Sequence, residues 1–175
     1  MTARTIYLLR HAKSSWGDAS LSDFDRPLNK RGLKARETMA RYMEGRGYRP
    51  DVVFCSAAKR AVMTLDAVRP ILNSDTKVTV DEGLYLADPK ALAHRMENLE
   101  SSVTSVMLIG HNPGFHMLAL ALTEPSTSAE YNALQFKNPT AALCVLQTDQ
   151  PHWRPMMEKS CRLVDYALPR ELAAA

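Results

Sequence analysis

Thr5-Ile-Tyr-Leu-Leu-Arg10-His11 is the stretch that decides the fold. A short apolar run ends in a basic and a polar side chain, which is typical of a buried strand with functional groups at its end. The same arrangement recurs where residues 51–55 precede Ser56 and where residues 103–109 precede Gly110-His111. This recurrence predicts several buried strands that each end in polar residues.

The predicted strands alternate with predicted helices. Strands are expected at residues 5–10, 51–55, 77–80, 103–109, 141–147 and 156–164, and helices at 30–44, 57–72, 89–99 and 115–122, after a long loop at 12–29. Such alternation predicts an α/β fold, a three-layer α/β/α sandwich around a mainly parallel central sheet. The last two strands are expected to pair as an antiparallel hairpin through residues 148–151. The length of 175 residues favours a single domain, residues 1–175.

The composition is that of an ordinary globular protein, with 46% hydrophobic and 23% charged residues. The sequence has no apolar stretch long enough to span a membrane and no signal-peptide pattern at its start, so we expect a cytoplasmic protein. Three widely spaced cysteines, Cys55, Cys144 and Cys161, favour buried free thiols over a disulfide.

Positive charge is concentrated in the first third of the chain. Residues 1–60 contain 13 Lys and Arg against 6 Asp and Glu, whereas the whole chain has a net charge of only +3. Such a basic region indicates either an anionic ligand or the solvated face of a helix, and the sequence leaves both open.

Histidine and arginine side chains collect where the predicted parallel strands end. Arg10 and His11 end the first strand, Arg60 lies one turn into the helix after the second, and His111 follows the fourth. Ligands of such sheets bind beyond the carboxyl ends of the strands. Arginine forks can hold the oxygens of a transferring phosphoryl group, and neutral imidazole can attack phosphorus. The nearby arginines are expected to lower the pKa of His11 and keep it neutral.

Four stretches together resemble the histidine phosphatase superfamily, and above all the short bacterial phosphohistidine phosphatases of the SixA type. They are Leu8-Leu-Arg-His-Ala-Lys-Ser14, Asp25-Arg-Pro-Leu-Asn-Lys-Arg-Gly32, Ser56-Ala-Ala-Lys-Arg-Ala-Val-Met-Thr64 and Ile109-Gly-His-Asn-Pro113, in the family's order. The resemblance implies a phosphoglycerate mutase-like fold and a phosphatase that uses neither metal nor cofactor. It also implies His11 as the nucleophile of a covalent phosphohistidine intermediate, with Arg10, Arg60 and His111 as the phosphate pocket.

The chain departs from the superfamily's mutases directly after the Arg-His pair, where they have Gly and Glu and this chain has Ala12 and Lys13. Glu82 stands where many relatives have a general acid. It is therefore a candidate catalytic acid, with a solvated surface carboxylate as the alternative. Lys13, Ser14 and Asn112 are expected either to touch phosphate or to shape the loop. Ser56 is expected to cap the following helix rather than to serve the chemistry.

The substrate class follows from the short stretch between Glu82 and the fourth strand. That stretch has no room for a large lid, which favours an open site and hence protein phosphohistidine as the substrate. A small phosphorylated molecule hydrolysed with Glu82 as the acid is the alternative. The sequence leaves the oligomeric state open.

Other functions fit the sequence less well. A cysteine phosphatase would need five residues between its cysteine and its arginine, but four separate Cys55 from Arg60. His111 and His116 are five residues apart, which does not place them on one helix face as metal ligands. A catalytically silent phosphate-binding module would not need all four pocket residues. A nucleic-acid-binding module would be expected to have aromatic residues among the basic ones, so we expect no nucleic-acid partner.

Overall fold

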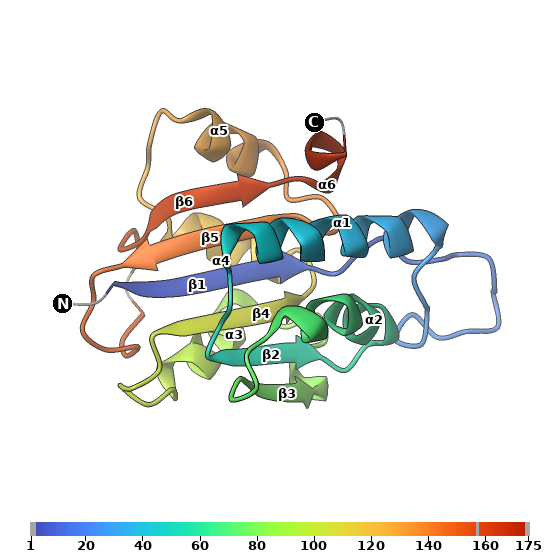
Figure 1. Ribbon diagram of the computed structural model, residues 1–175, viewed down its shortest axis with the longest axis horizontal. Coiled ribbons are helices and arrows are strands. Elements are labelled where there is room, and N and C mark those ends of the chain that lie inside the picture. The colour runs from blue at the N-terminus through green and yellow to red at the C-terminus, as the bar shows by residue number, and fades with distance from the viewer. Residues whose placement is uncertain (1–2, 157, 174–175) are drawn as a thin grey trace.

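Six strands form one central sheet in the computed structural model, which describes residues 3–156 and 158–173. The strand order is β3-β2-β4-β1-β5-β6, and the first four are mutually parallel (Figure 1). The strands are β1 (Arg4–Arg10), β2 (Val52–Ser56), β3 (Lys77–Asp81), β4 (Ser105–Gly110), β5 (Leu143–Thr148) and β6 (Arg162–Ala167). β5 runs antiparallel to both β1 and β6, which confirms the mainly parallel sheet with antiparallel pairing at its C-terminal side.

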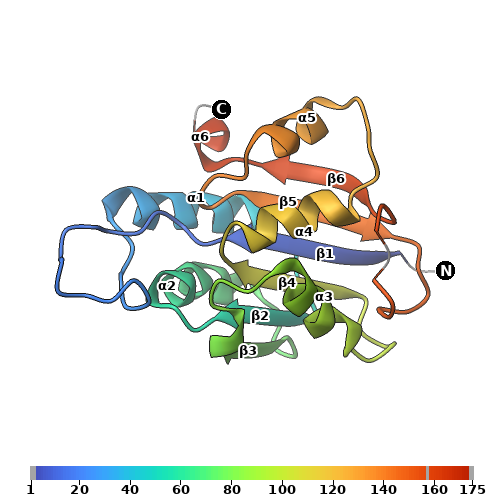
Figure 2. The same ribbon diagram turned by 180° about the vertical axis from the view of Figure 1, so that it is seen from behind.

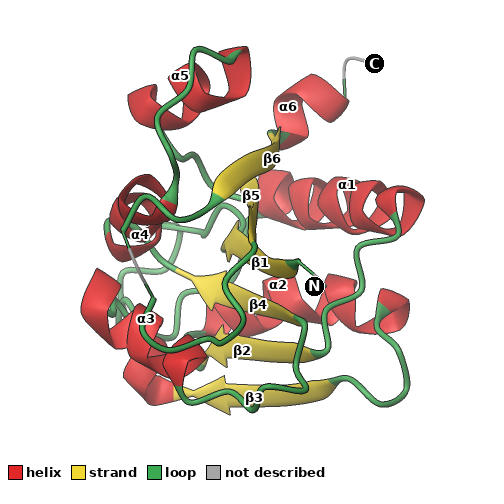
Figure 3. Ribbon diagram, turned by 90° about the vertical axis from the view of Figure 1, so that its left-hand side faces the viewer, coloured by secondary structure: helices red, strands yellow, loops and turns green. Residues whose placement is uncertain are grey.

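Helices cover both faces of the sheet. α1 and α2 lie on the face seen in Figure 1, and α3 and α4 lie on the face seen in Figure 2. Figure 3, which looks along the sheet, shows these layers on its two sides. The helices are α1 (Lys30–Arg46), α2 (Lys59–Val68), α3 (Pro89–Glu97), α4 (Gly114–Leu122), α5 (Ala129–Phe136) and α6 (Pro169–Leu172), with short 3-10 turns η1 (Arg69–Ile71) and η2 (Glu82–Leu84).

Each face of the sheet packs into its own apolar cluster. Leu9, Val53 and Ile109 face Met39 and Met43 of α1, together with residues of α2. Alternate positions of the same strands face α3, α4 and α5 in the second cluster. This alternation fixes the register of the strands, because a slip by one residue would exchange the two clusters.

Several expected boundaries were wrong. The predicted strand 156–164 begins only at Arg162, and Met157 lies outside the described residues. The connection from β5 is therefore long rather than the tight hairpin expected through residues 148–151. Side-chain contacts hold this irregular segment in place: Trp153 is buried and donates a hydrogen bond from Nε1 to the Val103 carbonyl at 2.9 Å, and Arg4 stacks on its ring.

Two helical predictions also needed correction. The helix expected over residues 57–72 ends at Val68 and continues as the turn η1, since Pro70 has no N–H to extend the α-helical pattern. Helix α5 was not predicted. Ser128 caps it by accepting a hydrogen bond from the Tyr131 amide, a signal that the sequence contained.

No helix among the described residues is long and apolar enough to cross a membrane. The cytoplasmic location and the single domain over residues 1–175 stay predictions. The cysteines Cys55, Cys144 and Cys161 are buried and free, as expected.

Candidate active site

The candidate site lies at the carboxyl ends of β1, β2 and β4. Arg10 is the last residue of β1, His11 follows it, His111 directly follows β4, and Arg60 lies in the first turn of α2. The fold therefore brings together four of the five predicted site residues. His11, Arg60 and His111 are buried, and Arg10 is partly exposed.

His11 is held in one tautomer by the backbone. Its Nδ1 lies 2.7 Å from the carbonyl oxygen of Ala12, which can only accept a hydrogen bond, so Nδ1 carries the proton. Nε2 is then unprotonated and accepts a hydrogen bond from Nε of Arg60 at 3.4 Å. The lone pair of Nε2 is the nucleophilic one, and it lies on the side of the ring that faces Arg60.

Burial holds His11 neutral. It lowers the pKa of His11 to about 3, opposed by the hydrogen bond to Ala12 and assisted by the charges of the neighbouring His111, Arg60 and Arg10. The expected direction is confirmed, but burial is a larger cause than the arginines. His11 is thus a neutral imidazole at neutral pH, with its one ring proton on Nδ1.

His111 is the second buried imidazole. Its ring centroid lies 4.9 Å from that of His11, and burial together with Arg60 lowers its pKa to about 4. Nε2 of His111 lies 2.8 Å from Oγ of Ser56, while its buried Nδ1 has no hydrogen-bond partner among the described residues. Ser56 was expected to cap α2, but the N-cap is Ala58, without a side-chain hydrogen bond of its own. Oγ of Ser56 accepts a 3.3 Å hydrogen bond from the Ala58 amide and also contacts His111.

Asp23 is a site residue that sequence reasoning missed. Its carboxylate lies 2.9 Å from Nη2 of Arg60 and 2.6 Å from Nη1 of Arg26, and it accepts a 2.6 Å hydrogen bond from the Tyr85 hydroxyl. Nη1 of Arg60 also donates to the Asp23 backbone carbonyl. The Tyr85 hydrogen bond and Arg60 keep the pKa of Asp23 below its usual value. Asp23 is therefore an ionised carboxylate that fixes two arginines.

Loop contacts fix the remaining arginine and the floor of the site. Nη1 of Arg10 donates to the Asn138 carbonyl at 2.8 Å, and Nδ2 of Asn112 donates to the same oxygen. Nε of Arg10 is buried and has no partner among the described residues. Gly32 of α1 allows the loop at Lys13 to pack closely against the helix, since a Cβ on Gly32 would lie 2.1 Å from the Lys13 carbonyl oxygen.

These side chains surround a cavity of about 450 Å³. Trp16, which is 80% exposed, and Leu86, which is 53% exposed, stand at its rim. The guanidinium of Arg26 lies over the Trp16 ring at 3.3 Å from its centroid. The cavity is lined by Arg10, His11, Lys13, Ser14, Trp16, Asp23, Arg26, Arg60, Leu86, His111, Asn112, Pro139 and Thr140.

Glu82 is not among the residues that line this cavity. It is exposed at the start of η2, and the nearby carboxylate in the cavity is Asp23. The role of Glu82 as an acid stays a prediction. Asp23 could not be found from sequence because no periodicity marks it within the loop 12–29, although Arg26 lies in one of the motifs quoted above.

The described residues contain no group of three or more His, Cys, Asp and Glu side chains placed to hold a metal ion. The dense cluster instead consists of three arginines, two neutral histidines and one ionised carboxylate. Buried guanidinium groups aimed at a common cavity suit an anion with several oxygens, such as a phosphoryl group.

Comparisons with known proteins agree with this geometry. A model of the histidine phosphatase superfamily (branch 1) matches residues 6–85. An uncharacterized protein of Mycobacterium tuberculosis is 30% identical over 93% of this chain and 100% of its own length.

Solved structures extend the likeness to the whole fold. The candidate phosphohistidine phosphatase SixA from Agrobacterium tumefaciens is 30% identical with a TM-score of 0.78, covering 95% of this chain and 99% of that one. The SixA protein from Nakamurella multipartitia has a TM-score of 0.82 over 97% and 98% of the two chains, and its 24% identity shows the shared fold alone. The expected phosphoglycerate mutase-like fold is confirmed, and the chain belongs to the histidine phosphatase superfamily.

Proposed function

We propose that this protein is a phosphatase that forms a covalent phosphohistidine on His11, and that its substrate is protein phosphohistidine. The observation that carries the proposal is the buried, neutral His11, whose unprotonated Nε2 faces Arg60 at a cavity lined by arginines. Family membership supports phosphatase activity, and the substrate is the further step proposed here.

The reaction has two displacements at phosphorus. Nε2 of His11 attacks the phosphorus atom, a new P–N bond forms, and the P–N bond of the substrate breaks. Water then attacks the phosphoryl group on His11, the new P–N bond breaks, and inorganic phosphate leaves. Arg10 and Arg60 stabilise the charge on the phosphoryl oxygens in both steps.

His111 has the right geometry to assist. In the tautomer that we propose, the Ser56 hydroxyl donates to Nε2 of His111, and the proton of that neutral ring resides on Nδ1, the buried atom without a partner among the described residues. This N–H donates to a phosphoryl oxygen in the proposed complex. Neither imidazole then needs to be charged.

The state of the carboxylates favours a phosphoramidate over an ester. An alkoxide leaving group needs a proton from an acid. Asp23 is ionised and hydrogen-bonded, and Glu82 does not line the cavity. Phosphohistidine protonated at its second ring nitrogen leaves as neutral imidazole and needs no enzyme acid. The exposed rim at Trp16 and Leu86 also suits a protein surface.

Trapping of the intermediate tests the proposed nucleophile. The wild-type enzyme is mixed with a ³²P-labelled phosphohistidine protein and quenched in alkali. We expect an acid-labile, alkali-stable label on the enzyme. In His11→Ala we expect no label and a fall in turnover of at least about a thousandfold, because the covalent route is lost.

His94→Ala is the matched control, since that imidazole is 71% exposed on α3. It should keep both label and turnover. Unlabelled wild type that turns over its substrate, or full activity in His11→Ala, would contradict the covalent route.

Glu82→Gln tests the substrate class. We expect turnover of the phosphohistidine protein to change by less than about twofold, because no acid is required for its leaving group. Rates with sugar phosphates are measured beside it. Strong sugar phosphate hydrolysis that collapses in Glu82→Gln would replace this proposal with a general phosphomonoesterase.

A further inference from the structure

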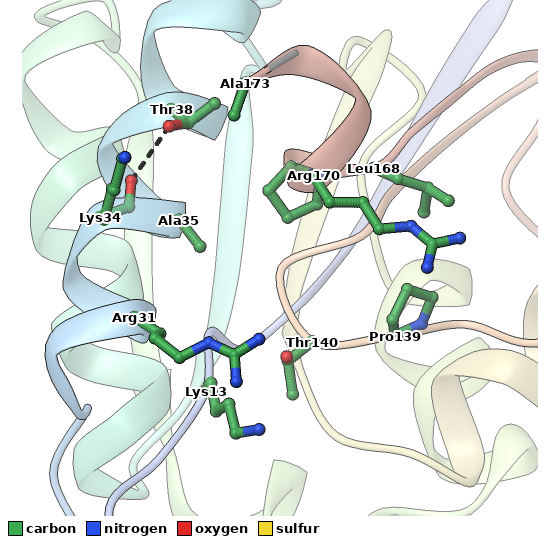
Figure 4. Close-up of a pocket in the computed structure, with 11 residues that line it drawn as sticks. Lys13, Arg31, Lys34, Ala35, Thr38, Pro139, Thr140, Leu168, Arg170 and Ala173 are labelled. Atoms are coloured by element: carbon green, nitrogen blue, oxygen red, sulfur yellow. Dashed lines mark hydrogen bonds between the residues drawn. The ribbon is translucent and has the colours of Figure 1, made fainter.

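A second cavity, of about 340 Å³, adjoins the phosphate pocket (Figure 4). It lies between the N-terminal half of α1 and the short helix α6. Lys13, Pro139 and Thr140 line both cavities, so the two are direct neighbours. We call this second cavity the basic cleft, after the four cations that line it: Lys13, Arg31, Lys34 and Arg170.

The four cations surround an apolar floor. In Figure 4, Arg31 of α1 and the neighbouring Lys13 extend toward Thr140. Lys34 extends along α1 toward Thr38, and Arg170 lies on the side of α6 with its guanidinium pointing away from α1. Ala35, Pro139 and Leu168 supply apolar surface between them. A bare anion needs only the charges, whereas this mixture suits a peptide segment whose acidic side chains meet the cations and whose backbone and stems cover the floor.

The positive charge of the basic cleft is not neutralised within the described protein. No carboxylate lines the cleft, and no described Asp or Glu lies within 4.0 Å of a nitrogen of Lys13, Arg31 or Lys34 in an ion pair. Arg170 reaches Glu171 only at 3.9 Å, with both side chains more than half exposed. Exposed pairs of this kind contribute little, so the field of the cleft stays positive.

The position of these cations on α1 is unfavourable for the helix itself. The N-terminus of a helix carries a partial positive charge and favours Asp and Glu in the first turn. The first turn of α1 contains no acidic residue, and it begins with Lys30 and Arg31, followed by Lys34 in the second turn. An external anion at the cleft would offset this repulsion.

We propose that the basic cleft binds an acidic segment of the phosphorylated protein substrate while the phosphorylated side chain occupies the adjoining pocket. This inference rests on the proposed function, which it deepens by naming a feature of the substrate. Complementary charge speeds association and selects partners. Substrates that carry Asp or Glu near the phosphorylated residue are therefore preferred.

The test compares two double variants. The cleft variant carries both Arg31→Glu and Lys34→Glu, and the charge-matched control carries both Lys77→Glu and Lys90→Glu. The control lysines are exposed, on β3 and α3, and line neither cavity. The cleft variant should fold normally, because acidic residues suit the start of α1. Circular dichroism and melting temperature check this for both variants.

The kinetic measurement uses two substrates, an acidic phosphohistidine protein and inorganic phosphoramidate, which is small enough to need only the phosphate pocket. In the cleft variant kcat/KM for the protein should fall by about tenfold, mainly through association, while phosphoramidate turnover stays unchanged. Raising salt from about 50 to about 300 mM should weaken wild-type turnover of the protein substrate and leave phosphoramidate unaffected. Equal kinetics for the cleft and control variants would overturn the proposal.

A binding measurement separates this inference from the proposed function. Fluorescence anisotropy follows a labelled oligo-glutamate peptide titrated with wild type, cleft variant and control. Loss of binding in the cleft variant alone supports an acidic occupant even if the wild type fails to hydrolyse phosphohistidine. Equal binding of oligo-glutamate to all three proteins would overturn the inference. A single-stranded oligonucleotide is tested in the same way. If the cleft variant loses binding of the oligonucleotide but not of oligo-glutamate, the cleft binds nucleic acid instead, and the inference is overturned.

Discussion

The proposed phosphate pocket and the basic cleft share lining residues, yet they hold their cations in opposite ways. In the pocket, Arg60 is 4% exposed and is fixed by His11 and by both the carboxylate and the carbonyl of Asp23. In the cleft, Arg31, Lys34 and Arg170 are exposed. Fixed, buried charges suit the stabilisation of a transition state, because they need no reorganisation during the reaction. Exposed charges suit association with a variable partner.

This contrast predicts the largest effect at Arg60. Arg60→Lys should lower kcat/KM for phosphoramidate by about a hundred- to a thousandfold, as is typical for loss of a fixed donor at a developing charge. One ammonium group cannot reach His11, the Asp23 carbonyl and the Asp23 carboxylate together. Arg170→Lys in the cleft is the control and should remain within about twofold. Steady-state kinetics of both variants measure kcat/KM for phosphoramidate. Similar losses in Arg60→Lys and Arg170→Lys would contradict the difference between the fixed cations of the pocket and the exposed cations of the cleft.

A smaller effect is expected at Asp23, which we interpret as a positioning residue. Asp23→Asn keeps the shape but removes the charge between Arg60 and Arg26, so kcat/KM for phosphoramidate should fall by about tenfold. Because the charge of Asp23 raises the pKa of His111, the variant should also lower that pKa further. NMR titration of His111 measures this shift. An unmoved pKa beside reduced activity would indicate a merely structural role.

The last expected effect concerns stability rather than rate, and it arises from the buried histidines. The pKa of His11 is about 3 in the folded protein against 6.5 as its ordinary value, so the unfolded chain binds the extra proton between these pH values. Stability should therefore be fully present above about pH 6.5 and fall with acidification, by up to about 1.4 kcal/mol per pH unit for this residue.

Urea unfolding at pH 7, 6 and 5 measures that slope. In His11→Asn the change of the unfolding free energy with pH should be smaller, by the contribution of about one bound proton. The cleft variant, with Arg31→Glu and Lys34→Glu, should keep the contribution that the histidines make in the wild type. An unchanged slope in His11→Asn would mean that His11 is not held neutral by burial.

The sequence predicted the fold well where local pattern and burial agree. Apolar runs such as residues 5–9 and 104–109 are typical of strands in a sheet that is covered on both faces, and both form parallel strands of the sheet. It failed at Trp153 and around β6, where side-chain contacts with distant residues hold an irregular segment. No local rule predicts such a segment, because its stability comes from the partners and not from its own periodicity.

The candidate site divides in the same way. Arg10, His11, Arg60 and His111 were found from sequence because strand ends in a parallel sheet converge on one edge. Asp23 was missed because it approaches Arg60 from a loop 37 positions earlier in the chain, with Tyr85 arriving from another element. Such a contact between residues from three separate segments is determined only by the packed fold.

The amino-acid sequence by itself therefore determined the sheet and the residues at its edge, since hydrophobic periodicity and strand polarity are local properties. The tertiary structure decided the main cause of the neutral state of His11, because burial is set by the whole chain. It also decided where the excess positive charge of residues 1–60 lies. Part of that charge is buried and paired with Asp23 in the candidate site, and part is exposed in the basic cleft, because α6 and residues 139–140 close a cavity against α1.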